Sequence, residues 1–212
     1  MAYTLLIGNK NYSSWSLRPW LLLHASGIAF AEEKHLFETP EFAAEISSRK
    51  RSPNGRVPVL VDGDVKVWDS LAIAEYLAER HPGLWPADAA ARAHARSACA
   101  EMHSSFGALR NWMPMNVRRS YPVATPREDV QKDIDRMQAL WTEARSRFGA
   151  GGPYLYGTFS NADAYFAPVV FRFNTYGVKC SPVVADYVTT MLAHPSMQQW
   201  IAAAKAEAPV VD

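Results

Sequence analysis

The chain is poor in the features that would tie it to an oxidising compartment, a membrane or a strongly charged partner. Its 212 residues include only two cysteines, Cys99 and Cys180, so we expect no disulfide framework. No apolar run approaches the roughly 18 residues of a membrane-spanning helix, and the first residues lack the basic segment of a secretory leader. With 22 basic and 21 acidic side chains, the net charge of +1 gives no reason to expect nucleic acid or an anionic membrane as a partner. We therefore expect a soluble cytoplasmic protein, and a hydrophobic content of 49% allows a full core.

One stretch, residues 51–77, can be interpreted almost residue by residue. The run from Val57 to Val61 is short, apolar and rich in β-branched residues, which predicts a buried strand. Asp62-Gly63 is a hairpin signal, and Val65 to Trp68 is expected to return as the second strand. The pair Asp69-Ser70 supplies N-cap residues for a helix that continues to the end of the stretch.

Pro58 is the unusual residue of this stretch, because a proline removes a hydrogen-bond donor from a buried strand. A cis Val57–Pro58 bond would tolerate the proline and would turn the Val57 backbone outward, toward a ligand backbone. Cis bonds are only about 5–6% of X–Pro bonds in folded proteins, so the residues alone do not decide this. The free N–H groups after Asp69 and Ser70 favour a carboxylate. A small peptide with a free carboxylate fits both positions, and so does an ordinary strand–hairpin–helix unit with a capped helix.

The same stretch resembles the glutathione-binding half of the glutathione S-transferase family. Asn54-Gly-Arg-Val-Pro-Val-Leu is similar to the family's N/K-G-x-V-P-x-L run, which carries a cis proline. Asp69-Ser-Leu-Ala-Ile-Ala-Glu-Tyr-Leu is similar to its (E/D)-S-x-A-I-x-x-Y-L run, which holds the γ-glutamyl group. The resemblance implies a cis Val57–Pro58 bond and a glutathione site that is formed by Val57, Pro58, Asp69 and Ser70.

The order of predicted elements supports the same fold. Tyr3–Gly8 is expected to be a central strand, followed by a helix, a strand over Phe30–Phe37, a short helix over Pro40–Ser47, and then the hairpin and its helix. This β-α-β-α-β-β-α order is thioredoxin-like. We expect an α/β thioredoxin-like domain at residues 1–80.

The remainder of the chain is predicted to be helical. Residues 81–87 hold two prolines and a glycine and are expected to be a linker to an all-α domain at 88–212. A long helix is predicted from Ala89 to about Met113, and another from Pro126 to Phe148, opened by a capping box at Thr125. Further helices follow Ser160, Ser181 and Pro195; Gly157 to Asp163, with Pro168, resembles a folding element of the transferase family's helical domain.

Three serines, Ser13, Ser14 and Ser16, lie where the first helix begins. Because that helix follows a central strand, its N-terminus lies at the edge of the sheet near Val57–Pro58. A thiol there would meet a helix dipole and a hydroxyl donor, and both favour the thiolate. Lowering a thiol pKa from about 8.5 by about two units needs about 2.7 kcal/mol, and one charge-assisted hydrogen bond supplies about 1.5–3 kcal/mol. Helix capping explains at least one of these serines without any catalysis.

The segment Ser13-Ser-Trp-Ser-Leu-Arg18 is similar to the S-S-C-S-W-R run of zeta-class transferases, in which the first serine is catalytic. The resemblance implies Ser13 as the catalytic residue, with Ser14 as a neighbouring donor. Trp15 stands at the position of the zeta cysteine. This departure argues against zeta-type isomerisation and against mixed-disulfide chemistry.

The pocket for a second substrate is expected to be apolar and to lie between the domains. Its candidate wall residues are Trp15, Met102, Phe106, Arg110 and Trp112. Met102 and Phe106 also fit the core stripe of a helix, which is the more frequent role of such spacing.

Four polar residues have two interpretations each. Arg56 either meets a ligand carboxylate or is solvated, and Arg18 either pairs with an anion or bridges the domains. Cys99 and His103 share a helical face, but two such residues without further ligands more often pack than bind metal, so no metal is expected.

Three functions compete at this point. The first is a glutathione S-transferase that activates the glutathione thiol for attack on a small, mostly apolar electrophile. The second is a glutathione-dependent isomerase of the maleylacetoacetate type, and the third is a non-catalytic assembly module. Glutathione is expected as co-substrate, and the resemblance implies a homodimer whose interface is formed by the helices from Ala89 and Pro126. The residues do not name the electrophile.

Overall fold

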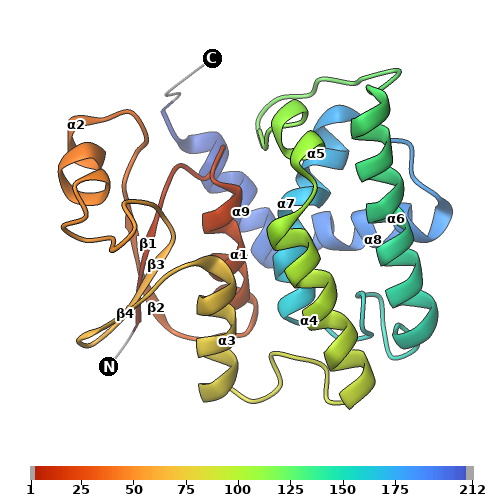
Figure 1. Cartoon of the computed structure of the whole chain (residues 1–212), viewed down its shortest axis with the longest axis horizontal. Coiled ribbons are helices and arrows are strands. Elements are labelled where there is room, and N and C mark those ends of the chain that lie inside the picture. Colours follow the sequence, from red (N-terminus) through yellow and green to blue (C-terminus); the bar gives the residue numbers. More distant parts are fainter. Residues whose placement is uncertain (1–2, 209–212) are drawn as a thin grey trace.

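The computed structural model describes residues 3–208, with a sheet at one end and a bundle of helices at the other (Figure 1). The sheet has the order β2-β1-β3-β4. Its strands are β1 (Tyr3–Ile7), β2 (Phe30–Lys34), β3 (Val59–Asp62) and β4 (Val65–Val67). β1 runs parallel to β2 and antiparallel to β3, which continues into β4 through the hairpin. The predicted central position of the first strand is confirmed.

Helices cover both faces of the sheet. α1 (Ser14–Ala25) and α3 (Ser70–Arg80) lie on the face toward the helical bundle, whereas α2 (Pro40–Phe42) and the π-helical turn η1 (Ala43–Ser47) lie on the outer face (Figure 1). The outer face has a small core of its own, formed by Leu6, Ile46 and Val59. The thioredoxin-like order predicted from the sequence is confirmed.

The rest of the described chain is helical, as predicted. Its helices are α4 (Ala89–Ser104), α5 (Gly107–Trp112), α6 (Glu128–Phe148), α7 (Asn161–Tyr176), α8 (Pro182–Ala193) and α9 (Pro195–Ala206). α7 is buried over nearly its whole length, and it packs on one side against α1 and on the other against α4 and α8. α9 returns along α1 toward the sheet (Figure 1). One continuous apolar core therefore joins the sheet face of α1 to the bundle.

Two predicted helix boundaries are corrected. The helix expected to run to Met113 breaks after Ser104, because Phe106 adopts a left-handed backbone (φ 63°) and buries its ring in the core. The Arg110 guanidinium donates to the carbonyls of Met102 and Ser105, which α4 leaves without helical partners.

The second correction concerns α6. This helix begins at Glu128, with Arg127 as an N-cap that makes no capping hydrogen bond, so the capping box predicted at Thr125 is wrong. The box predicted at Ser160 and Asp163 is confirmed in both of its hydrogen bonds.

Candidate functional site

The hairpin brings its two ends to one corner of the sheet. The Val57–Pro58 peptide bond is cis, and so is the Trp68–Asp69 bond. Asp69 caps α3, because its Oδ1 accepts a hydrogen bond from the N–H of Leu71 at 2.9 Å. Ser70, only 1% exposed, is the first residue of the helix. The corner therefore places the Val57–Pro58 pair near the N-terminus of α3, and a helix N-terminus is suited to an anion.

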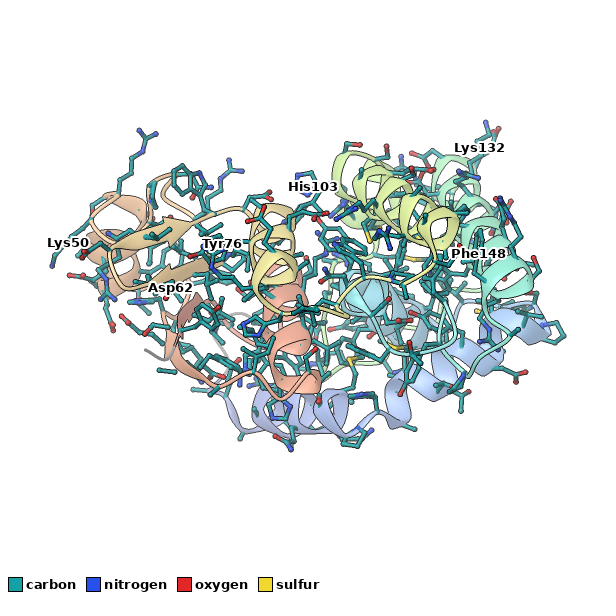
Figure 2. All side chains as sticks on the ribbon, turned by 90° about the horizontal axis from the view of Figure 1, so that it is seen from below. Lys50, Asp62, Tyr76, His103, Lys132 and Phe148 are labelled. Carbon is teal, nitrogen blue, oxygen red and sulfur yellow. The ribbon has the colours of Figure 1, made fainter. Side chains whose placement is uncertain are left out.

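A cavity of about 300 Å³ opens at this corner. Its lining consists of Trp15, Asn54, Arg56, Val57, Pro58, Asp69, Ser70 and His103. The fold thus brings to one cavity the residues expected to bind glutathione, Val57, Pro58, Asp69 and Ser70, together with the candidate Arg56. His103 reaches it from the end of α4, on the side that faces α3 (Figure 2). Its spacing from Cys99 on the helix predicted packing, because such spacing carries no signal for a site formed with the sheet domain.

A second cavity, of about 380 Å³, lies beside the first and shares Trp15, Arg56 and Val57 with it. Its other lining residues are Tyr12, Ser13, Ser14, Phe37, Phe42 and Gly55. Both candidate catalytic serines therefore face a space that adjoins the corner of the hairpin. An extended ligand that starts at Ser70 has room to reach the start of α1.

Ser13 is the N-cap of α1. Its Oγ accepts from the N–H of Ser16 at 3.4 Å and donates to the Oγ of Ser16 at 2.7 Å. Ser16 is fully buried, and its Oγ also accepts from the N–H of Gly8 at 3.1 Å. The Ser14 hydroxyl has no hydrogen-bond partner among residues 3–208. Capping thus accounts for Ser13 and Ser16, while Ser14 keeps an uncommitted proton.

Arg18 bridges the two parts of the fold and does not line either cavity. Its guanidinium lies between the rings of Trp15 and Tyr165, 4.3 and 4.1 Å from their centroids, and its Nε donates to the carbonyl of Tyr165. Burial lowers the pKa of Arg18 to about 10, which leaves the group charged near neutral pH. Of the two interpretations, the inter-domain bridge is the one that the contacts favour.

Of the five residues expected to form the electrophile pocket, only Trp15 lines either of these two cavities. Trp15 faces both cavities, but Met102 of α4 (0% exposed) and Phe106 before α5 (4% exposed) are buried in the core. Arg110 is occupied in capping the end of α4 and stacks on Trp15, with its guanidinium 4.7 Å from the ring centroid. Trp112 is half-buried and packs against the core. The other aromatic residues that line the second cavity are Tyr12, Phe37 and Phe42.

The loop before Ser13 is held by a residue from the far end of the chain. Glu207 accepts from the backbone N–H of Lys10 at 2.9 Å and from that of Asn11 at 3.3 Å, and its side chain is 2% exposed. The Lys34 ammonium lies 3.1 Å from the same carboxylate. Because two consecutive backbone donors depend on one side chain, Glu207 fixes the loop that leads into the serines.

Replacing Glu207 with alanine is expected to lower the free energy of unfolding by about 1–3 kcal/mol, because two buried donors lose their acceptor. For a chain of this length that corresponds to a fall in Tm of roughly 2–12 °C, measurable by calorimetry. Glu207→Gln keeps one carbonyl oxygen as an acceptor, so its Tm is expected to fall less than that of Glu207→Ala. Equal Tm values for the alanine variant and the unaltered protein would contradict the role.

Three further observations concern Cys99, metal binding and membrane spans. Burial raises the pKa of the Cys99 thiol, so this cysteine is an unreactive core residue. Within residues 3–208, no group of three His, Cys, Asp or Glu side chains is placed to hold a metal ion. No helix in that range is long and apolar enough to cross a membrane.

The mixed sheet, the hairpin corner and the helical bundle define the glutathione transferase fold. Residues 12–80 match the family model for the glutathione S-transferase N-terminal domain. The solved structure of a glutathione transferase homolog from Burkholderia gl BGR1, with bound glutathione, is similar with a TM-score of 0.71 and 25% identity, covering 98% of this chain and 100% of that one.

Two curated proteins are similar to this chain over most of its length. The probable maleylacetoacetate isomerase of Caenorhabditis elegans is 26% identical over 207 residues, which cover 88% of this chain and 93% of that protein. The stringent starvation protein A homolog of Pasteurella multocida is 27% identical over 180 residues, covering 80% of this chain and 78% of that protein. Together these matches support the glutathione S-transferase family for this chain, with the family's N-terminal domain over residues 12–80.

Proposed function

We propose that this protein is a glutathione transferase that binds glutathione at the hairpin corner and activates its thiol at the start of α1. One observation carries the proposal: the cavity formed by Val57, Asp69 and Ser70 adjoins the cavity that Ser13 and Ser14 line. One site therefore holds a place for each end of the ligand and a hydroxyl donor for its sulfur.

The γ-glutamyl group is assigned to the first cavity. Its ammonium pairs with the Asp69 carboxylate, and its carboxylate meets the Ser70 hydroxyl and the first N–H groups of α3, where the helix dipole favours negative charge. The Val57 backbone beside the cis bond pairs with the backbone of the ligand's cysteine. Arg56, exposed at the boundary of both cavities, is available to a ligand carboxylate.

The sulfur is assigned to the second cavity, where Ser13 donates to the thiolate and Ser14 is the neighbouring donor. The thiolate attacks a carbon of the electrophile and forms a carbon–sulfur bond. An aromatic halide loses its halide ion in this step, whereas a conjugated double bond breaks its π bond and the resulting carbanion takes a proton from water. The rings of Tyr12, Phe37 and Phe42 suit a small, mostly apolar electrophile. We also propose a cytoplasmic homodimer, with an interface on the exposed sides of α4 and α6 and domain limits of 1–80 and 88–212.

Two other functions keep specific support. Similarity to a probable maleylacetoacetate isomerase favours glutathione-dependent isomerisation, although Trp15 replaces the cysteine of the zeta motif. Similarity to a stringent starvation protein A homolog favours a module without catalysis. An assay with a generic aromatic halide, run beside a maleyl-type substrate, separates the three functions: conjugation supports the transferase, turnover of the maleyl compound alone supports the isomerase, and glutathione binding without either reaction supports the module.

Ser70→Ala is expected to weaken glutathione binding by about 1–3 kcal/mol, or roughly 5- to 150-fold in Kd, because a buried carboxylate would lose a hydrogen bond. Calorimetric titration measures this directly. Ser181→Ala, at the exposed N-cap of α8, is the matched control and is expected to leave Kd unchanged. Unchanged affinity for Ser70→Ala would remove Ser70 from the site.

A further inference from the structure

Ser16 contacts Ser13 through both its backbone and its side chain. The N–H of Ser16 donates to the Oγ of Ser13 at 3.4 Å, and the two hydroxyl oxygens are 2.7 Å apart. Ser16 is fully buried and lines neither cavity, whereas Ser13 lines the second one. The Oγ of Ser16 also accepts from the N–H of Gly8 at 3.1 Å, directly after β1. Ser16 therefore ties the proposed thiol donor to the central strand.

The cap of α1 uses the backbone of Ser16 rather than its hydroxyl. Ser16 is the third residue after the N-cap, where a capping box places a longer side chain that bonds to the N–H of the N-cap residue. That N–H, of Ser13, already donates to the carbonyl of Asn9 at 2.8 Å. An alanine at position 16 would supply the same capping N–H. Within residues 3–208, the Ser16 hydroxyl bonds to Ser13 and Gly8 alone.

The direction of the bond between the two hydroxyls decides what Ser13 can offer to a ligand. Each serine hydroxyl has one proton and two lone pairs. In the resting geometry the proton of Ser13 lies between the oxygens, and the Ser16 oxygen accepts twice, from Ser13 and from Gly8. While this direction holds, Ser13 has no proton for a thiolate.

A thiolate beside Ser13 favours the opposite direction. When Ser13 turns its proton to the sulfur, the two oxygens still face each other, because the N–H of Gly8 holds one and the N–H of Ser16 holds the other. Their separation of 2.7 Å is that of a hydrogen-bonded O–H···O pair, so a proton is needed between them. The hydroxyl of Ser16 can supply it.

We propose that Ser16 is a positioning residue of the thiol site, which reverses its hydrogen bond and donates to Ser13 when the thiolate forms. The inference rests on the proposed function, because it requires a glutathione sulfur beside Ser13. Both protons stay on their own oxygens and only rotate, so the two serines neither take up nor release a proton. A hydroxyl that accepts a bond in this way becomes a stronger donor, by about 10–30% per bond. Ser16 thus strengthens the bond to the thiolate without touching the ligand.

The sign of a pKa shift tests this role. The thiol pKa of bound glutathione is measured from the thiolate's ultraviolet absorbance in Ser16→Ala and in the unaltered protein. Loss of a donor to Ser13 is expected to raise that pKa by about 0.1–0.6 unit, which is 10–30% of the one to two units that correspond to the bond from Ser13. If Ser16 only competes for the proton of Ser13, its loss frees that proton and lowers the pKa instead, by about 0.4–1 unit.

Further variants separate the relay from a structural effect. Ser16→Cys fills the same space with a poor donor and is expected to raise the thiol pKa as Ser16→Ala does; its own titration is subtracted with glutathione-free protein. Ser16→Thr keeps the hydroxyl and is expected to retain the pKa of the unaltered protein. Ser196→Ala is the matched control and is expected to leave the pKa unchanged. It removes another buried serine hydroxyl, 2.8 Å from the Nδ1 of His24 on α1, that lines neither cavity.

A double variant shows whether Ser16 acts through Ser13. Because Ser16 does not reach the ligand, adding Ser16→Ala to Ser13→Ala is expected to cause no further shift of the thiol pKa. A further rise in the double variant would mean that Ser16 acts on the sulfur by another route, and would overturn the inference.

The outcomes also separate the inference from the function on which it rests. Failure of glutathione to bind the unaltered protein would overturn both. A titration that Ser13→Ala leaves unmoved would remove Ser13 as the donor, and Ser16 with it. A shift in Ser13→Ala, together with no shift or a fall in folded Ser16→Ala and Ser16→Cys, would overturn the role of Ser16 alone and leave the glutathione site intact.

Discussion

Replacing Ser13 with alanine is expected to raise the pKa of the bound glutathione thiol by about one to two units and to leave glutathione affinity nearly unchanged. The lost interaction is a charge-assisted hydrogen bond worth about 1.5–3 kcal/mol, and one pKa unit corresponds to about 1.36 kcal/mol. For a bound thiol with a pKa near 6.5, about two units below its free value, the shift reduces the thiolate fraction at pH 7 by roughly 3- to 25-fold. Turnover should fall in proportion.

The resting geometry of Ser13 is compatible with this role. Capping uses a lone pair of its Oγ, which accepts from the N–H of Ser16, whereas stabilising a thiolate uses its proton. That proton now points to the Oγ of Ser16 at 2.7 Å. A neutral hydrogen bond contributes about 0.5–1.5 kcal/mol, and a bond to a charged group about 1.5–3 kcal/mol. The Ser13 hydroxyl is therefore expected to donate to a thiolate within reach rather than to the Oγ of Ser16.

Titration of the thiolate's ultraviolet absorbance in single variants tests the assignment. Ser14→Ala is the closest control, since its hydroxyl faces the same cavity and has no partner among residues 3–208. A shift in Ser14→Ala with none in Ser13→Ala would move the assignment by one residue. If Ser13→Ala, Ser14→Ala and Tyr12→Phe all leave the titration unmoved, backbone N–H groups at the start of α1 stabilise the thiolate, and the hydroxyl mechanism is wrong.

The sequence predicted the fold and the first cavity well because their signals are local. The hairpin over Val57–Trp68 is specified by a two-residue turn and by alternating strand residues, and Asp69 caps the helix that follows directly. Parallel pairing of the first two strands then places the start of α1 beside the same corner. Local turn and capping chemistry therefore sufficed to bring Val57, Pro58, Asp69 and Ser70 together.

The contacts that the sequence did not predict join residues far apart in the chain. His103 reaches the first cavity from α4, Tyr165 of α7 lies behind it with its hydroxyl 2.7 Å from the Nδ1 of His103, and Glu207 holds a loop near residue 10. Nothing in their own neighbourhood distinguishes them from packing or surface residues. The prediction of one helix through Phe106 was wrong for a related reason. The left-handed backbone of Phe106 is compensated by burial of its ring and by the hydrogen bonds of Arg110, and both are tertiary effects.

Replacing Asp163 with alanine is expected to destabilise the protein more than any other change considered, by about 2–5 kcal/mol, because two buried backbone N–H groups lose their acceptor. The carboxylate is fully buried at the start of α7 and accepts from the N–H of Leu155 at 3.1 Å and from that of Ser160 at 2.9 Å. It also accepts from the Ser160 hydroxyl at 3.2 Å. Since α7 packs against α1, α4 and α8, its first turn anchors the centre of the molecule.

The pH dependence of this effect has a definite sign. Burial raises the pKa of Asp163 from 3.8 to about 6. Between these pH values the folded protein keeps the proton that the unfolded chain releases, so the folded state binds more protons and this residue's contribution to stability falls as the pH rises from about 4 to about 6. A shift of about two units corresponds to about 3 kcal/mol over that window.

Thermal unfolding of Asp163→Ala at neutral pH is expected to show a Tm lower by roughly 4–20 °C, given about 2–4 °C per kcal/mol for a chain of this size. Asp163→Asn does not titrate, so its stability relative to the unaltered protein should improve as the pH rises from 4 to 7. Asp186→Ala, on the exposed side of α8, is the control and is expected to change stability by no more than about 0.5 kcal/mol. A stability difference between Asp163→Asn and the unaltered protein that stays constant from pH 4 to 7 would show that the carboxylate is ionised throughout, held by its three donors against the cost of burial.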